Sequence, residues 1–341
     1  MKSPSRQILG AALALIATHA AAAPASISYR LVRTVPLGAP ERWDYVVFDA
    51  GSHRVFVAHG DRVSVVDARS GQLLGEVSGI PGGTHGTGVS LATGQGFTDD
   101  GRAGVAVAFD LKTLKVLKRI PAEADADGVV TDPVTGHVFV IDGDSAKVTV
   151  IDPSTDAPIA DVDAGGKLEA AAAGRDGRIY VNGAEKREVV VIDARTNRVT
   201  GRWAVPACVS PHGIAVDAAA HRLFVSCVNS QMAVLDAQSG RIVATVPIGR
   251  GSDAAAWDPG RKLAFSSNGQ DGTISVIRQT APDRYVALPP IRTAPSARTM
   301  AVDPATGRLF VAAADLEQAA PGARPRPKSG TLRLMFYDPS R

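Results

Sequence analysis

The sequence predicts an all-β fold, a single seven-bladed β-propeller with four-stranded blades. A turn phrase of two apolar residues and an aspartate recurs at close to 42-residue intervals from Asp67 to Asp236. Short alternating segments rich in Val and Ile lie between the turns, and no window has amphipathic helical spacing. Residues 30–38 (RLVRTVPLG) nearly copy residues 241–249 (RIVATVPIG), the last strand of a complete unit. An early strand of this kind can complete the unit left unfinished at the C-terminus, which closes the ring.

The first 22 residues have the three parts of a secretory signal peptide. Lys2 and Arg6 precede an apolar run over residues 8–17, and Ala-rich small residues follow. Pro24 disfavours cleavage directly before it, so we expect the cut after Ala20 or Ala22. The run is too short for a stable membrane span, and no second apolar segment reaches spanning length. The sequence therefore predicts a periplasmic or secreted protein with no membrane span.

The mature chain, residues 23–341, is predicted to be one propeller domain. Its blades are expected at about residues 43–78, 79–121, 122–163, 164–205, 206–247, 248–289 and 290–341. The last blade lacks an outer strand after Tyr337, and residues 29–37 are expected to supply it. Such pairing removes the free edges of an open array.

The repeated aspartates are interpreted as hairpin corners rather than catalytic acids. Each opens a short turn in which its carboxylate can accept backbone N–H groups, and Gly or Asn often follows at the left-handed position. The five corners are Asp67, Asp110, Asp152, Asp193 and Asp236.

Two phrases carry a resemblance to a known family. The segments Val138-Phe139-Val140 and Ile179-Tyr180-Val181-Asn182 each precede an Ile-Asp corner. Together with strands that end like residues 244–249 (ATVPIG), they resemble the YVTN repeat of the YncE-like periplasmic β-propellers. The resemblance covers residues 29–341. It implies the propeller fold and export, and it says little about chemistry, because this repeat occurs in binding, surface-layer and uncharacterised exported proteins alike.

One polar residue stands just before the innermost strand of each blade. In a propeller these positions ring one mouth of the central channel, and we call the set the collar. Concave polar surfaces that several repeats share are the default candidates for ligand binding. The collar consists of Asp44, His85, Asp127, Glu169, His212, Asp253 and Arg298.

A second ring of polar residues is expected on the same face, in the loops between the second and third strands. Its members are His59, Asp142, Asn182, Asn229, Asn268 and Asp271. A competing interpretation is that collar residues only cap strand ends or pair with one another, as Arg298 could with Asp44 or Asp253. Polar channel mouths are common in propellers without a ligand.

No cofactor follows with certainty from the sequence, but a divalent metal ion suits the collar. Imidazole and carboxylate groups bind zinc, manganese or iron, while carboxylate and Asn groups suit calcium. An ion that touches both histidines, which lie three blades apart, has to sit on the channel axis. The expected ligands are His85, His212, Asp127, Glu169 and Asp253, with Arg298 left to clamp a substrate carboxylate or phosphate.

The two cysteines, Cys208 and Cys227, lie nineteen residues apart in blade 5, both on the collar face. An even pair in an exported protein favours a disulfide. A thiol nucleophile paired with His212 is the alternative.

Charge and composition restrict the partners. The formal net charge is +3, and loss of Lys2 and Arg6 with the signal peptide leaves about +1, so global charge predicts no nucleic-acid binding. A small polar or anionic molecule or a protein partner is expected on the collar face. Heptad seams and exposed apolar repeats are absent from the sequence, so a monomer is expected.

Two functions from different classes remain open. The first is an exported YncE-like propeller that binds a small ligand or a protein partner on the collar face. The second is a metal-assisted hydrolase or lyase, similar in layout to lactonase and lyase propellers that hold an ion on the channel axis. The sequence identifies no activating base, so it leaves open whether the chain is an enzyme.

Overall fold

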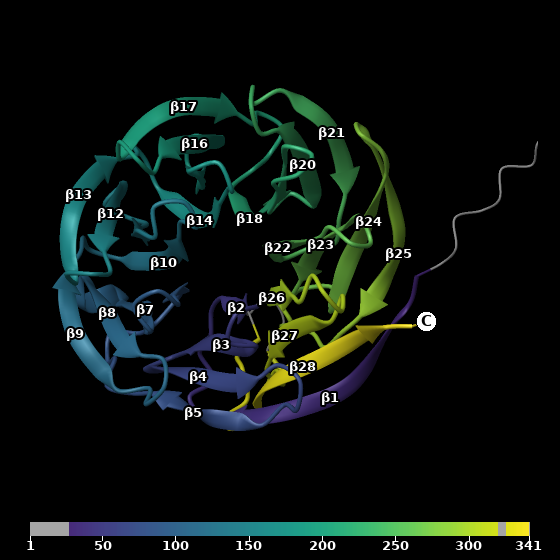
Figure 1. Ribbon diagram of the computed structural model, residues 1–341. Helices are drawn as coiled ribbons and strands as arrows, with labels where there is room; N and C mark the ends of the chain where they lie inside the picture. Colours follow the sequence, from purple (N-terminus) through teal and green to yellow (C-terminus); the bar gives the residue numbers. More distant parts are fainter. Residues whose placement is uncertain (1–26, 320–324, 341) are drawn as a thin grey trace, which may run out of the picture.

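The computed structural model describes residues 27–319 and 325–340 and contains seven four-stranded antiparallel sheets arranged in a ring (Figure 1). This confirms the predicted seven-bladed β-propeller. The predicted signal peptide, residues 1–22, lies outside the described residues. In the described part of the chain, no helix has the length and hydropathy that crossing a bilayer requires.

Within each blade the strands run in chain order from the channel to the outer wall, except that the first strand of the chain is the outer strand of blade 7. Blade 1 contains β2 (Val46–Asp49), β3 (Arg54–His59), β4 (Arg62–Asp67) and β5 (Leu73–Val77). Blade 2 contains β6 (Thr87–Ser90), β7 (Gln95–Asp100), β8 (Val105–Asp110) and β9 (Val116–Pro121), with the 3-10 turn η1 (Gly101–Ala103). Blade 3 contains β10 (Ala126–Thr131), β11 (Val138–Asp142), β12 (Lys147–Asp152) and β13 (Ala157–Asp163).

The remaining blades follow the same plan. Blade 4 contains β14 (Leu168–Ala173), β15 (Arg178–Gly183), β16 (Glu188–Asp193) and β17 (Arg198–Ala204). Blade 5 contains β18 (Pro211–Asp217), β19 (Arg222–Cys227), β20 (Gln231–Asp236) and β21 (Ile242–Pro247). Blade 6 contains β22 (Ser252–Asp258), β23 (Leu263–Asn268), β24 (Thr273–Ala281) and β25 (Arg284–Arg292). Blade 7 contains β26 (Thr299–Val302), β27 (Leu309–Ala313), β28 (Leu332–Pro339) and β1 (Tyr29–Gly38). Strand β25 passes the boundary expected at residue 289, because the β24–β25 hairpin is longer than in the other blades.

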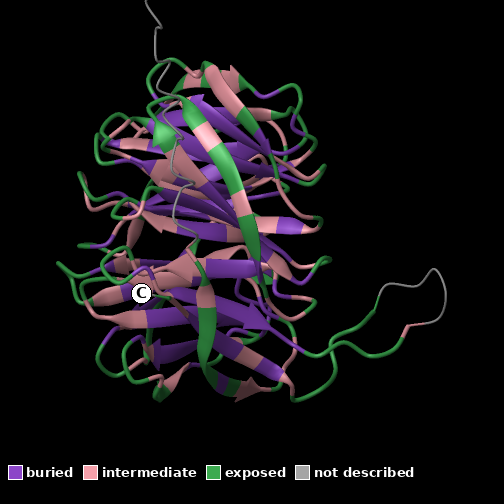
Figure 2. Ribbon diagram, turned by 90° about the vertical axis from the view of Figure 1, so that its right-hand side faces the viewer, coloured by how far each residue is buried: buried purple, intermediate pink, exposed green. Residues whose placement is uncertain are grey.

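The core lies between neighbouring sheets rather than in one centre. The two middle strands of each blade are buried on both faces, whereas the outer strands are mostly exposed or half-buried (Figure 2). One buried aromatic ring per blade stands in the second strand and packs against the adjacent sheet. These rings are Phe56, Phe97, Phe139, Tyr180, Phe224, Phe265 and Phe310. Sheets that bury both faces in this way stabilise each other around the ring.

Ring closure occurs as predicted, by pairing of the two ends of the chain. Strand β1 runs antiparallel to β28, with Tyr29 opposite Pro339 and Pro36 opposite Arg333 (Figure 1). Blade 7 is also tied to blade 1, because Arg308 forms a bidentate ion pair with Asp338 and donates to the Ala68 carbonyl. Both termini of the propeller therefore belong to one sheet.

The repeated aspartates are hairpin corners. In the first of them, Asp67 Oδ1 accepts the backbone N–H groups of Arg69 and Ser70 at 3.0 and 2.7 Å. The carboxylates of the other four corners accept backbone N–H groups in the same way. These bonds lower the pKa of each corner carboxylate, which keeps it ionised and confirms a structural role.

The expected disulfide is present between Cys208 and Cys227, whose Cα atoms lie 5.2 Å apart. Both residues are buried. The bridge joins the segment before β18 to the end of β19, so it fixes the loop that leads into the inner strand of blade 5. Because both sulfurs are bonded, a thiol nucleophile at either position is not available in this structure.

Removal of this disulfide is expected to lower the free energy of unfolding by about 3 kcal/mol, because the bridge restricts the unfolded chain. The double variant Cys208→Ala/Cys227→Ala should unfold at a lower urea concentration than the oxidised wild type. Wild-type protein unfolded under reducing conditions is the matched control and should behave like the variant. Coincident unfolding curves for the variant and the oxidised protein would contradict a stabilising role.

Candidate functional site

The collar residues occupy equivalent positions at the channel end of each inner strand. Three of them lie one or two residues before the inner strand of their blade, namely Asp44, His85 and Arg298. Each of the other four is the second residue of the inner strand of its blade. His85 is buried and the rest are half-buried. The structure divides the seven into three contacting groups, centred on Arg298, His85 and His212.

Arg298 bridges two carboxylates across blades 6, 7 and 1. Its Nη1 lies 3.1 Å from Asp253 Oδ2 and its Nη2 lies 3.5 Å from Asp44 Oδ2. Nη2 also donates to the Trp43 carbonyl, and the guanidinium lies 5.5 Å from the centre of the Trp43 ring. The structure thus shows the ion pairing that the competing interpretation allowed.

The side chain of His85 is held by Asp99, a buried residue of strand β7. Asp99 Oδ2 lies 2.6 Å from His85 Nδ1, and Asp99 Oδ1 accepts the backbone N–H groups of His85 and Gly86. His85 Nε2 lies 2.9 Å from Nη2 of Arg42, an exposed side chain. Burial lowers the pKa of His85, but the Asp99 bond and the charges of Asp127 and Asp44 outweigh it and raise the pKa to about 9. The sequence places Asp99 in the polar segment at the end of the second strand of blade 2, on the collar face, but it does not indicate the bond to His85.

Three collar residues approach closely enough to share a cation. One ligand atom from each of Asp44, His85 and Asp127 lies within 4.8 Å of the others, and Asp127 Oδ1 lies 3.9 Å from His85 Nδ1. Two carboxylates and an imidazole are a ligand set for a divalent transition metal. This group includes Asp44, which the sequence did not assign as a ligand, and it does not include the other three expected ligands, His212, Glu169 and Asp253.

His212 and Glu169 form the third group. Their nearest atoms, His212 Nε2 and Glu169 Oε1, lie 3.9 Å apart, and both ring nitrogens of His212 are buried without a hydrogen-bond partner among the described residues. Burial lowers the pKa of His212. Burial raises the pKa of Glu169 to about 8, and the nearby Asp127 and Asp253 carboxylates add to this shift. At neutral pH the pair therefore consists of a neutral imidazole and a largely protonated carboxyl group.

Tyr45 is a further residue of the channel, and sequence reasoning missed it. It comes from blade 1 but packs against the cluster that contains Ala170 and Ile214 of blades 4 and 5, on the opposite side of the ring. Its hydroxyl interacts electrostatically with all four collar carboxylates, which together with burial raise its pKa. The side chain therefore crosses the channel under the collar.

The sequence does contain a signal for this residue. The position after the collar residue is Tyr in blade 1 and Gly or Ala in five other blades, namely Gly86, Gly128, Ala170, Gly213 and Ala254. A Cβ at Gly86 would lie 2.5 Å from the Val129 nitrogen, so small residues let inner strands approach. Below the collar these residues line a channel cavity of about 150 Å³. The side chain of Tyr45 lines the same cavity.

The second ring does not converge on the channel. His59 bonds to Ser64 and the Pro40 carbonyl, Asp142 accepts from Thr149, and Asn268 donates to Thr273 and Ser275. Asn229 and Asp271 accept backbone N–H groups of neighbouring loops. Only Asn182 touches the collar, by donating to the His212 carbonyl at 2.6 Å. These residues fix the loops that carry the collar, because each loop has backbone groups that need partners.

The collar holds more negative than positive groups. Burial raises the pKa of Asp44 to about 7 and that of Asp127 to about 6, and nearby carboxylates strengthen both shifts, although Arg298 and His85 oppose them. A carboxyl group with a raised pKa is one whose charge is poorly compensated. An added cation would supply that compensation.

Comparisons with known proteins identify the fold. No family model matches the chain, and no curated protein matches it. Among solved structures, the WD40 repeats of RRP9 are 12% identical, with a TM-score of 0.75 over 92% of this chain and 98% of that chain. A chain of a mitotic checkpoint complex is 15% identical, with a TM-score of 0.74 over 98% of both chains. Hydrazine synthase of Kuenenia stuttgartiensis is 14% identical, with a TM-score of 0.69 over 80% of this chain and 93% of that chain. These similarities show a WD40-like propeller fold.

Proposed function

We propose that this protein is an exported, YncE-like ligand-binding propeller whose collar binds a divalent cation through Asp44, His85 and Asp127. The observation that carries the proposal is the meeting of these three side chains within 4.8 Å, in a mouth where carboxylates outnumber cations. Export is supported by the buried disulfide, since such bonds persist in oxidising compartments, and by the N-terminal sequence.

The surroundings of His85 support a metal-binding role. Metal-bound histidines commonly donate their second ring N–H to a carboxylate, which fixes the ring, and Asp99 provides such a partner at 2.6 Å. Coordination through Nε2 requires that the His85 ring loses a proton and that Arg42, an exposed side chain, moves aside. A small polar or anionic molecule can then reach the protein as a further ligand of the cation.

Titration calorimetry with manganese or zinc chloride at pH 8 tests the proposal. Wild-type protein should bind about one ion. His85→Asn and Asp127→Asn should each weaken binding about 10-fold or more, because each removes a ligand of the ion, and loss of a residue that only supports a ligand already weakens binding by about that factor. The control variants His221→Asn and Asp163→Asn remove the same groups from exposed positions and should bind like wild type. Equal affinities across all five proteins would refute a collar site.

A metal-assisted hydrolase or lyase is the second candidate, and the His212–Glu169 pair favours it. The unpartnered, neutral imidazole of His212 can accept a proton, and the protonated Glu169 carboxyl group can donate one. The cation would polarise the carbonyl group of a bound ester or lactone. Under this candidate, His212→Asn abolishes turnover of a lactone and aryl-ester panel but keeps the affinity for manganese. If manganese-loaded wild-type protein turns over none of these substrates, the hydrolase or lyase candidate is excluded and only the binding function remains.

A further inference from the structure

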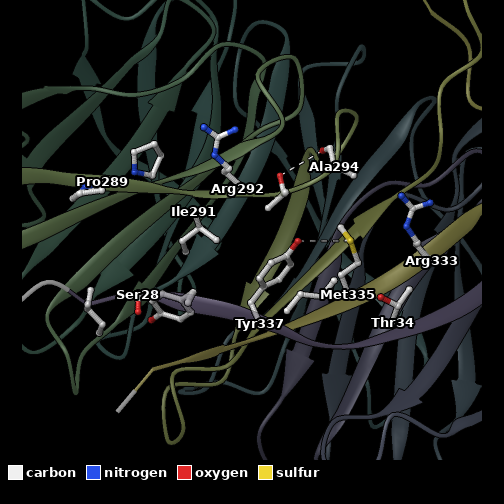
Figure 3. A pocket seen from close by; sticks show the side chains of 14 residues that line it. Ser28, Thr34, Pro289, Ile291, Arg292, Ala294, Arg333, Met335 and Tyr337 are labelled. Carbon is white, nitrogen blue, oxygen red and sulfur yellow. Dashed lines mark hydrogen bonds between the residues drawn. The ribbon is translucent and has the colours of Figure 1, made fainter.

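A groove runs along the outer wall of the ring, far from the collar chemistry, between blades 6 and 7 (Figure 3). Its volume is about 690 Å³, within the range of ligand-binding clefts. The two outer strands β25 and β1 form its sides. Residues that line it include Tyr29, Leu31, Ile291, Arg292, Met335 and Tyr337.

The floor of the groove is apolar. Ile291, Met335 and Tyr337 belong to the core cluster that joins the two blades, and Leu31 on the side is 50% exposed. Among the described residues, the Tyr337 hydroxyl has Met335 Sδ as its only hydrogen-bond partner, at 3.8 Å (Figure 3). An apolar side chain inserted here would bury further surface, and a polar group beside it could satisfy this hydroxyl.

Both sides of the groove are strand edges. In the part of the chain that the structure describes, β1 pairs only with β28 and β25 pairs only with β24, so each has one unpaired edge. Pro289 and Pro290 lie in β25 on the groove and lack backbone N–H groups. They prevent a regular ladder along β25, whereas β1 retains N–H groups at residues 29–34. The edge of β1 is therefore the one able to accept a further strand.

The charge of the groove is positive. Arg292 and Arg333 line it, and no acidic side chain does so among the described residues. Arg333 pairs with Asp315 at 2.8 Å, whereas Arg292 is exposed and forms no ion pair in the described structure. Arg292 is thus available to a carboxylate of a bound molecule.

We propose that this groove binds an extended acidic segment of a partner protein, which adds a strand to the free edge of β1. Apolar side chains of the segment enter the floor, and a Glu or Asp side chain pairs with Arg292. A hydrocarbon anion such as a fatty acid would match the floor and the charge, but it would leave the backbone groups of β1 without partners. The inference does not depend on the cation site.

Fluorescence polarisation with the fluorescein-labelled peptide Val-Glu-Val-Glu-Val-Glu tests this proposal. The protein should bind it about 10-fold or more tightly than the versions with Gln or Lys in place of Glu. Arg292→Gln should weaken binding of the Glu peptide about 10-fold, while Arg284→Gln, at the exposed far end of β25, should not. Equal binding of the three peptides, no binding of any, or an Arg292→Gln variant that binds like wild type would overturn the proposal.

Hydrogen exchange locates the bound peptide. The Glu peptide should slow amide exchange in residues 29–34 and leave the collar loops unchanged. Slowed exchange only in the collar loops would overturn the proposed position. Displacement of the peptide by dodecanoate, together with unchanged exchange in β1, would overturn strand addition and identify the groove as a lipid-anion site.

Discussion

Deletion of β1, Tyr29–Gly38, is expected to destabilise the whole propeller and to lower its melting temperature by roughly 10–20 °C. The deletion removes the backbone pairing with β28 and the burial of Val35, which together contribute about 5 kcal/mol or more. It also leaves blade 7 with an open edge beside blade 1. Differential scanning calorimetry measures the change.

Two single substitutions in β1 serve as graded controls. Val35→Ala removes part of the one buried side chain of the strand and should lower the melting temperature by a few degrees. Thr34→Ala is exposed and should leave it unchanged. If the deletion variant melts like wild type, the N-terminal strand does not hold the ring together.

Raising the pH from about 5 to about 9 is expected to destabilise the cation-free protein. The carboxyl groups of Asp44, Asp127 and Glu169 have raised pKa values in the folded state. Their contribution to the free energy of unfolding is therefore present below about pH 4 and is lost as the pH rises through about 6 to 8. The raised pKa of His85 acts in the same direction, with stability present below about pH 6.5 and lost near pH 9. The lowered pKa of His212 opposes this below pH 6.5.

The substitution Glu169→Gln isolates one of these groups. It should stabilise the protein at pH 9 by on the order of 2 kcal/mol, because it removes a poorly compensated buried charge, and should change little at pH 4. Asp163→Asn, at an exposed position, is the matched control and should have no pH-dependent effect. Urea unfolding with a chelator present measures both. If the difference in free energy of unfolding between Glu169→Gln and wild type is the same at pH 9 and pH 4, the raised pKa is contradicted.

Much of the fold could be predicted because it repeats. The spacing of Asp67 and its equivalents marks each blade, the copied strand at residues 30–38 identifies ring closure, and two cysteines in one blade indicate the disulfide. These features depend on backbone pattern, which a single sequence records directly.

The collar was predictable in position but not in grouping. The repeat gives one polar residue per blade, and it allowed the pairing of Arg298 with Asp44 or Asp253 that the structure shows. The meeting of Asp44, His85 and Asp127 depends on side-chain directions across blades. The hydrogen bonds of Asp99 to His85 arise between two strands of blade 2, and Tyr45 crosses from blade 1 to blades 4 and 5. Such contacts depend on the three-dimensional radius of the channel, which spacing along the chain does not contain.

The division of the collar matters for function. The structure contains one group of collar residues suited to a cation and another suited to proton transfer. The two can therefore be altered separately.

Anomalous diffraction from crystals soaked in manganese chloride tests the cation site most directly. We expect one strong peak at coordinating distance from the Asp44 and Asp127 carboxylates and the His85 ring, and loss of that peak in Asp127→Asn crystals. A peak on the channel axis between His85 and His212, or no peak on the collar face, would contradict it.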